Sequence, residues 1–200
     1  DTNDLVISAS IGISLYPESA RNSLQFINQA NQAMQHAKYL GGNCFQFYSA
    51  ELPAQNTNRL RIENELRKAI NSQQLLLHYQ PKLRLSNQRF ESVEALVRWQ
   101  HPTRGLLLPG EFIAIAEETG LILPLGEQVL QMACKQASQW LHQGPAAIRV
   151  AVNMSVQQLR QPGFASQVES ILQQHKLPGH LLELELTENI LLEHSETVER

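Results

Sequence analysis

The stretch that decides the fold is Glu91-Ser92-Val93-Glu94-Ala95-Leu96-Val97-Arg98-Trp99-Gln100-His101-Pro102. Side chains alternate between the two faces of a strand, so the odd-numbered residues from Val93 to Trp99 form an apolar packing face. The opposite face carries Glu94 and Arg98, ionised groups that a buried strand tolerates only when something pairs with them. On this pattern alone, a surface strand with a weak Glu–Arg contact explains the stretch as well as a functional strand does.

Three further predicted strands also carry polar groups, each near its carboxyl end. Leu75–Pro81 presents Gln80, Ile148–Ser155 presents Asn153, and Leu182–Glu188 has its glutamates opposite three leucines. An α/β barrel builds an active site in this way, from single polar groups delivered by several strands. Taken together, the strands favour a functional site over a solvated surface.

Helical spacing separates these strands, at about residues 109–118, 124–143 and 162–175. Strands that alternate with helices predict a mainly parallel sheet. A further helix is expected from about Thr57 to Asn71. The polar segment before it contains Pro53, and we interpret residues 51–58 as a linker between two domains.

The first fifty residues show a separate, shorter pattern. Residues 5–15 and 44–48 are expected to be strands, and residues 23–40 have apolar groups at helical spacing. Ser23 is the expected N-cap of this helix, and Gly41-Gly42 its end.

Composition excludes several classes of protein. Of the 200 residues, 42% are hydrophobic and 18% charged, which fits a folded globular protein. The net charge of −3 does not indicate a broad basic surface for a nucleic-acid polymer. Cys44 and Cys134 have no metal-site spacing and are expected to be reduced thiols of a cytoplasmic protein. No signal peptide and no run of about 18 apolar residues is present. Because an initiator Met is missing, we expect a longer chain, on the cytoplasmic side of the membrane if its upstream part carries an anchor.

Six motifs between residues 59 and 200 come in the order and spacing of the EAL domain family. They are Tyr79-Gln80-Pro81, Glu94-Ala95-Leu96-Val97-Arg98-Trp99, Pro109-Gly110-Glu111-Phe112-Ile113, Ala116-Glu117-Glu118-Thr119-Gly120-Leu121-Ile122, Val152-Asn153-Met154-Ser155 and Glu185-Leu186-Thr187-Glu188. That family comprises cyclic di-GMP phosphodiesterases and their non-catalytic relatives. The resemblance implies a TIM-like (β/α) barrel of the EAL type, whose amino-terminal part is residues 59–200, so that the barrel is incomplete in this chain.

Residues 1–50 resemble the carboxyl-terminal end of a GGDEF domain, the diguanylate cyclase fold, an α+β remnant here. The resemblance rests on Ser10-Ile11-Gly12-Ile13-Ser14, Tyr16-Pro17, Ala30-Asn31-Gln32-Ala33-Met34-Gln35-His36-Ala37-Lys38 and Gly41-Gly42-Asn43. Asn31 and Gln35 depart from the family, which usually has Asp and Tyr there. Lys38 matches a lysine near the nucleotide phosphates, although a solvated helix lysine explains it equally well. The signature loop would lie upstream of Asp1.

Glu94, Asn153 and Glu185 are the candidate metal ligands. Two carboxylates about 4 Å apart repel each other by roughly 4 kcal/mol at an effective dielectric near 20, so a proton, a cationic side chain or a metal must relieve them. Carboxylate and amide oxygens favour Mg²⁺ or Mn²⁺ over zinc. The alternative is a polar cluster that shares a proton or pairs with arginine.

The resemblance implies a role for each remaining candidate. Glu94 and Glu188 belong to the catalytic machinery, Glu188 by holding an active-site loop, although a helix N-terminus also favours a carboxylate there. Arg98 contacts a substrate phosphate, for which a charged fork of donors is suited. Gln80 recognises the ligand by hydrogen bonds, although a Gln before Pro also occurs as an ordinary turn residue. Leu96 packs on a base or ribose.

The predicted function is metal-dependent hydrolysis of cyclic di-GMP to linear pGpG in bacterial second-messenger signalling. The alternative is a receptor that binds the dinucleotide without cleaving it. The family's paired aspartates and lysine would lie beyond Arg200, so we expect the 200 residues alone to be inactive. GTP at an intact GGDEF domain and a second copy of the chain, as a homodimer, are further candidate partners. No His-Glu-x-x-His, Gly-x-Ser-x-Gly or phosphate-loop motif competes with this interpretation.

Overall fold

The chain forms two compact units, which divide at Asn64 and Glu65. A computed structural model describes residues 7–18, 20–86, 88–144 and 147–186. The first unit contains β1 (Ile11–Ile13), α1 (Ser23–Tyr39) and β2 (Phe45–Phe47). β1 and β2 pair in parallel, and α1 forms the connection between them. No helix of the described residues is long and apolar enough to span a membrane.

Both ends of α1 have physical causes, and one differs from the prediction. Asn22 is the N-cap, not Ser23, because its side-chain oxygen accepts a hydrogen bond of 2.9 Å from the backbone N–H of Gln25. Gly41 and Gly42 end the helix as expected, with φ of +99° and +74°, a region that side chains disfavour.

Two other expectations for this part of the chain need correction. The strand expected over residues 5–15 is only β1, because the ladder to β2 extends from Ile11 to Ile13 and residues 7–10 remain irregular. The expected linker, 51–58, is helical from residue 52, since α2 spans Leu52–Ile70. Pro53 is tolerated there because the first turn of a helix leaves its N–H groups unbonded anyway.

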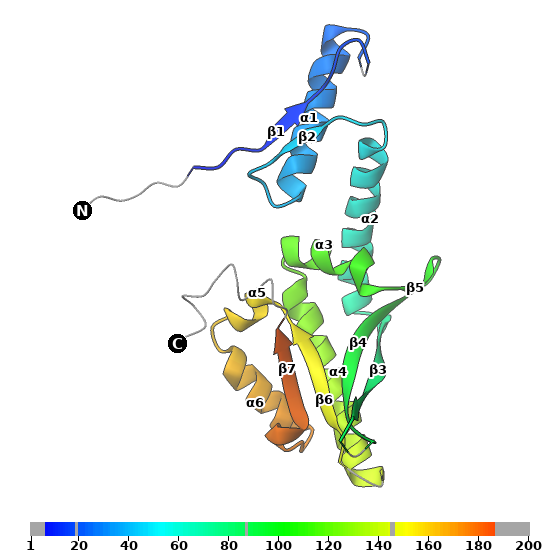
Figure 1. The fold of residues 1–200 in the computed structure, drawn as a ribbon, viewed down its shortest axis with the longest axis vertical. Helices are drawn as coiled ribbons and strands as arrows, with labels where there is room; N and C mark the ends of the chain where they lie inside the picture. Colours follow the sequence, from blue (N-terminus) through cyan, green and yellow to red (C-terminus); the bar gives the residue numbers. More distant parts are fainter. Residues whose placement is uncertain (1–6, 19, 87, 145–146, 187–200) are drawn as a thin grey trace, which may run out of the picture. The chain divides into compact units, whose positions relative to one another are not determined.

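The second unit follows the predicted alternation of strands and helices (Figure 1). In chain order its elements are β3 (Leu75–Arg84), β4 (Arg89–His101), β5 (Gly105–Leu107), the 3-10 helix η1 (Pro109–Glu111), α3 (Ile113–Glu118), α4 (Ile122–Gln143), β6 (Arg149–Met154), α5 (Val156–Leu159), α6 (Phe164–Gln174), the 3-10 helix η2 (Gly179–Leu181) and β7 (Leu182–Leu186). The predicted helices at 109–118, 124–143 and 162–175 are confirmed, the first of them as η1 followed by α3.

The sheet has the order β3-β4-β6-β7 and is mixed rather than mainly parallel. β4, β6 and β7 are parallel, but β3 and the short β5 pair antiparallel to β4. β3 and β4 follow each other in sequence with no helix between them, so they form a hairpin. Gln80 therefore lies beside Glu94 within the sheet, not at a shared carboxyl edge with the other polar groups.

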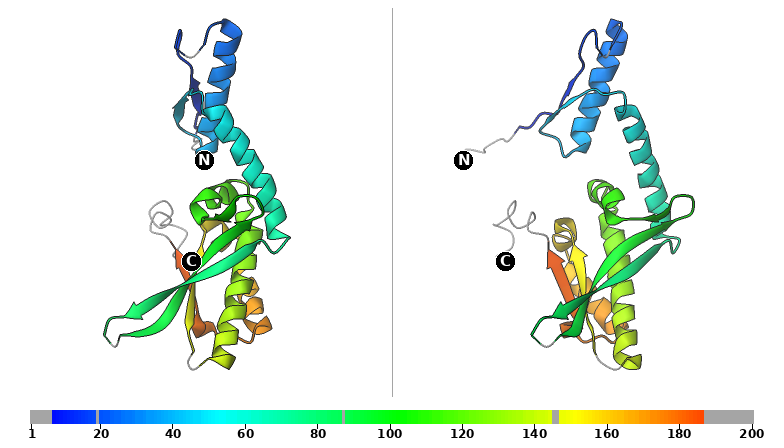
Figure 2. Two further views of the ribbon diagram at one scale, coloured as in Figure 1. Left: turned by 90° about the vertical axis from the view of Figure 1, so that its right-hand side faces the viewer. Right: turned by 45° about the vertical axis from the view of Figure 1, so that its right-hand side comes forward.

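One face of the sheet is the packing face that the alternation predicted. Trp99 is fully buried, its ring contacts Phe112, and its indole N–H donates to the side chain of Gln74. Val150 and Val152 of β6 are buried against α4. Figure 2 shows the β3–β4 hairpin bending away from the side that α4 and α6 cover, so the sheet curls around its other face. This other face carries the polar residues, and we call it the inner face.

Candidate metal centre on the inner face of the sheet

The inner face is defined by strand register. Glu94 of β4 pairs with Ala151 of β6, and residues paired across a sheet share a face. Asn153 follows Ala151 by two residues and therefore lies on the same face, and it pairs in turn with Glu185 of β7. Three neighbouring strands thus bring the three predicted ligands together, although 91 positions separate the first from the last in the sequence.

Glu94 and Asn153 are in direct contact. The side-chain N–H of Asn153 donates a hydrogen bond of 2.6 Å to Oε1 of Glu94. Glu94 and Glu185 are half-buried, whereas Asn153 is exposed. The amide is neutral, so it can lie between the two carboxylates without adding to their repulsion.

Lys82 is a member of this cluster that the sequence interpretation missed. Its ammonium contacts Oε1 of Glu185 directly, and it also interacts electrostatically with Glu94 and Glu183. The hydrogen bond to Glu185 raises the pKa of Lys82, and partial burial opposes this shift. The signal was available, because Lys82 follows Gln80 by two residues and therefore shares its face.

A capping box holds the end of β6 and with it Asn153. Ser155 accepts a hydrogen bond from the backbone N–H of Gln158, and the Gln158 side chain accepts one of 3.1 Å from the N–H of Ser155. These reciprocal bonds satisfy the free donors at the start of α5. Both side chains are buried, so the chain direction immediately after Asn153 is fixed by packing as well as by hydrogen bonds.

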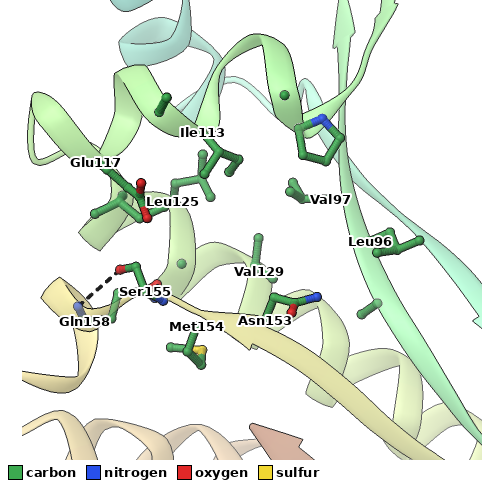
Figure 3. A pocket seen from close by; sticks show the side chains of 16 residues that line it. Leu96, Val97, Ile113, Glu117, Leu125, Val129, Asn153, Met154, Ser155 and Gln158 are labelled. Carbon is green, nitrogen blue, oxygen red and sulfur yellow. Dashed lines mark hydrogen bonds between the residues drawn. The ribbon is translucent and has the colours of Figure 1, made fainter. Parts of the chain in front are cut away.

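A cavity of about 490 Å³ opens beside the end of β6. Figure 3 shows Ile113 of α3, Leu125 of α4, Val97 of β4 and Asn153 arranged around it. Its lining is mostly apolar, and Asn153 is the candidate ligand that reaches it. A volume of this size accommodates a group such as a nucleobase with room to spare.

Glu117 also lines this cavity, and the sequence interpretation gave it no role. Burial raises the pKa of its carboxyl group. A carboxyl that is more easily protonated can donate a hydrogen bond as well as accept one.

The predicted substrate-binding residues lie on different parts of the sheet. Gln80 pairs with Glu94 and is exposed on the inner face. Leu96 follows Glu94 by two residues and lines the cavity. Arg98 follows Leu96 by two residues along β4, and its guanidinium donates a hydrogen bond of 2.8 Å to the backbone oxygen of Val97. Glu188 falls outside the described residues.

The three candidate ligands form a small set, and their oxygen atoms fit a hard divalent cation. Among the residues that the structure describes, no three His, Cys, Asp or Glu side chains gather into a metal-binding cluster. Glu94 and Glu185 therefore depend on the Asn153 amide to complete a set of three oxygen-bearing side chains. Such a set, with water completing the shell, is typical of Mg²⁺ or Mn²⁺.

Comparison with known proteins places this geometry in a family. Residues 63–200 match the family model described as EAL domain. Over 188 residues, which are 94% of this chain, the sequence is 43% identical to the bifunctional diguanylate cyclase/cyclic di-GMP phosphodiesterase MucR of Pseudomonas aeruginosa, of which the match covers 27%. It is 40% identical over 192 residues, or 96% of the chain, to the cyclic di-GMP phosphodiesterase NbdA of the same organism, of which the match covers 24%. The chain thus spans about a quarter of the length of these curated relatives.

Solved structures agree with the sequence comparison. The PaMucR phosphodiesterase in complex with c-di-GMP superposes with a TM-score of 0.64 at 43% identity, over 68% of this chain and 55% of that one. The FimX EAL domain of Xanthomonas citri in complex with c-diGMP superposes with a TM-score of 0.62 at 26% identity, over 72% of this chain and 55% of that one.

Proposed function

This chain belongs to the EAL domain family, and on that premise we propose that its protein hydrolyses cyclic di-GMP to linear pGpG in bacterial second-messenger signalling. The observation that carries the proposal is the contact between Glu94 and Asn153, in register with Glu185. The first two relatives above are named as phosphodiesterases of this dinucleotide, which supports the same reaction here.

Glu94, Asn153 and Glu185 would hold Mg²⁺ or Mn²⁺. When bound, the ion neutralises phosphate charge and lowers the pKa of a coordinated water. The protein's part is to keep the three donors on one rigid face. Adjacent hydrogen-bonded strands supply that rigidity, and the capping box after Asn153 limits the movement of the β6 end.

Arg98, Gln80 and Leu96 would bind the dinucleotide. Arg98 carries a permanent charge for a phosphate, and its bond to the Val97 carbonyl uses one of the five guanidinium N–H donors. Gln80 offers a donor and an acceptor next to Glu94, and Leu96 offers apolar surface at the cavity. Glu188 would hold an active-site loop by hydrogen bonds, as the family resemblance implies.

We also propose that residues 1–50 are the end of a GGDEF domain, with 51–58 joining it to the EAL part at 59–200. The match to MucR supports this, because it extends over 94% of the chain and so beyond the EAL match into the first fifty residues. We further propose that this domain binds GTP and that the protein forms a homodimer. We also propose a cytoplasmic location, at the membrane if an upstream anchor exists. We expect the 200 residues alone to be inactive.

The test is cyclic di-GMP hydrolysis by the intact protein, followed by chromatography of pGpG. Glu94→Ala should lower kcat by about a hundredfold or more, because it removes a metal ligand. Arg98→Ala should instead raise KM by about tenfold or more, because a charge-assisted hydrogen bond to phosphate is lost. Glu91→Ala is the matched control, since Glu91 is a glutamate of the same strand that pairs with Arg84 and not with the candidate ligands.

Two outcomes would overturn this assignment. Turnover by Glu94→Ala equal to that of the wild type would reject the metal role of Glu94. Binding of cyclic di-GMP by the wild type without any pGpG, in Mg²⁺ and in Mn²⁺, would make the protein a receptor rather than an enzyme.

A further inference from the structure

Lys82 reaches across the whole width of the described sheet. It belongs to β3 and Glu185 to β7, and β4 and β6 lie between these strands. In a flat sheet, strands about 4.8 Å apart would leave the two side chains too distant for contact. Their ion pair is possible because the sheet curls around its inner face, toward which the β3–β4 hairpin bends.

Glu185 forms its ion pair with Lys82, whereas Glu183 of the same strand pairs with a different cation. Arg149 lies 3.5 Å from Glu183, two residues before Glu185 on the same face. Lys82 is therefore available to Glu185, and Glu94 adds to its attraction into the cluster. Its side chain is 37% exposed and that of Glu185 27%, so the pair is partly solvated and can open.

We propose that Lys82 is a positioning residue that acts through Glu185, because its ammonium pairs with the carboxylate that would coordinate a divalent ion. The proposal rests on the proposed function, because it takes Glu185 as a metal ligand. A metal ion must then compete with the ammonium for Glu185. Lys82 thus sets the metal concentration at which the site fills. When the site holds no metal, Lys82 compensates the negative charge of the carboxylates.

The opposite role would be purely structural. If Lys82 only held Glu185 in its rotamer, its removal would leave a disordered ligand and weaker metal binding. The two roles predict opposite signs for the change in metal affinity, so one titration separates them.

The experiment is Mn²⁺ binding to the intact protein without nucleotide, from the electron paramagnetic resonance signal of free Mn²⁺. Lys82→Met keeps an unbranched side chain of similar length and removes the charge. It should bind Mn²⁺ about tenfold more tightly, because a positive charge that would repel the ion is removed from a solvated site. Lys82→Arg keeps the charge and should stay within about threefold of the wild type.

Arg84→Met is the matched control. It also removes a cation from β3, but Arg84 pairs with Glu91 rather than with a candidate ligand. Its Mn²⁺ affinity should equal that of the wild type. In addition, the difference between Lys82→Met and the wild type should shrink at high salt, since exposed charges are screened.

Equal or weaker Mn²⁺ binding by Lys82→Met would overturn the proposal while leaving the metal site intact. Equal tightening in Arg84→Met would also overturn it, because the effect would then be one of net charge. Absence of Mn²⁺ binding by the wild type would overturn both this proposal and the metal role of Glu94, Asn153 and Glu185.

Discussion

Asn153 shows how a single uncharged side chain makes a cluster of carboxylates possible. It donates to Glu94 and is paired in register with Glu185, so it lies where a third carboxylate would meet two others. The amide supplies an oxygen for a cation without a charge that must be balanced when the cation is absent.

Changing Asn153 to Asp should reverse this balance. In EDTA, Asn153→Asp should lower the free energy of unfolding by about 1 kcal/mol, because like charges about 4 Å apart repel even in a watery environment. In excess Mg²⁺ the loss should disappear, since a more acidic site binds the ion more tightly. Thermal melts with and without metal measure both effects. Gln139→Glu, the same charge change at an exposed position of α4, should show no metal-dependent difference.

The two cysteines should differ in reactivity. Cys134 is fully buried, and burial raises the pKa of its thiol to about 11, so little thiolate exists at pH 8. Cys44 is half-buried. Iodoacetamide at pH 8, followed by peptide mass spectrometry, should modify Cys44 and leave Cys134 free until denaturant is added. Modification of Cys134 at the same rate as Cys44 in the folded protein would contradict the burial.

At the scale of the element, the end of β4 is tied to α2 by one histidine. His101 is 3% exposed, and its Nε2 lies 3.1 Å from a carboxylate oxygen of Glu65. Its Nδ1 accepts from the backbone N–H groups of Thr103 and Arg104, each at 3.2 Å. Because Nδ1 accepts, the proton of the neutral ring is on Nε2 and points to Glu65.

Replacing His101 should therefore destabilise the second unit. His101→Ala removes these hydrogen bonds together with the packing of a buried ring against Trp99, at a cost of about 2–3 kcal/mol. His180→Ala, at an exposed position of η2, should change stability by less than about 0.5 kcal/mol. Urea denaturation followed by tryptophan fluorescence measures both. A change below 1 kcal/mol for His101→Ala would mean that water replaces its bonds.

At the scale of the whole molecule, two compact units share one chain and should respond separately to damage. Gly12 of β1 has no room for a side chain, because a Cβ there would lie 2.0 Å from the carbonyl oxygen of Ala30 in α1. The first unit therefore depends on this glycine, whereas the second does not contain it.

Gly12→Ala should consequently loosen the first unit only. Hydrogen–deuterium exchange of the intact protein should rise in peptides from residues 11–47 and stay unchanged in peptides from β4 and β6, because local opening follows local stability. Gly110→Ala is the control, since a Cβ there meets nothing within 4 Å. Faster exchange in β4 after Gly12→Ala would show that the two units unfold together.

Much of the second unit could be predicted because its signals are local. Alternation from Val93 to Trp99 depends only on the strand period of two, and this predicted the buried face correctly. The helix at 124–143 followed in the same way from apolar spacing. The N-cap at Asn22 and the helical start at Leu52 were missed, because a neighbouring residue or a tolerated Pro53 produces the same local pattern.

The sequence by itself determined which side chains share a strand face, and with them the three candidate oxygen donors and the family to which the motifs point. Only the tertiary structure decided that β3 pairs antiparallel and that the sheet curls enough for Lys82 to meet Glu185. The physical reason is that alternation is a property of consecutive residues. Strand pairing and curvature, in contrast, arise from contacts between residues as many as 103 positions apart, which no local period encodes.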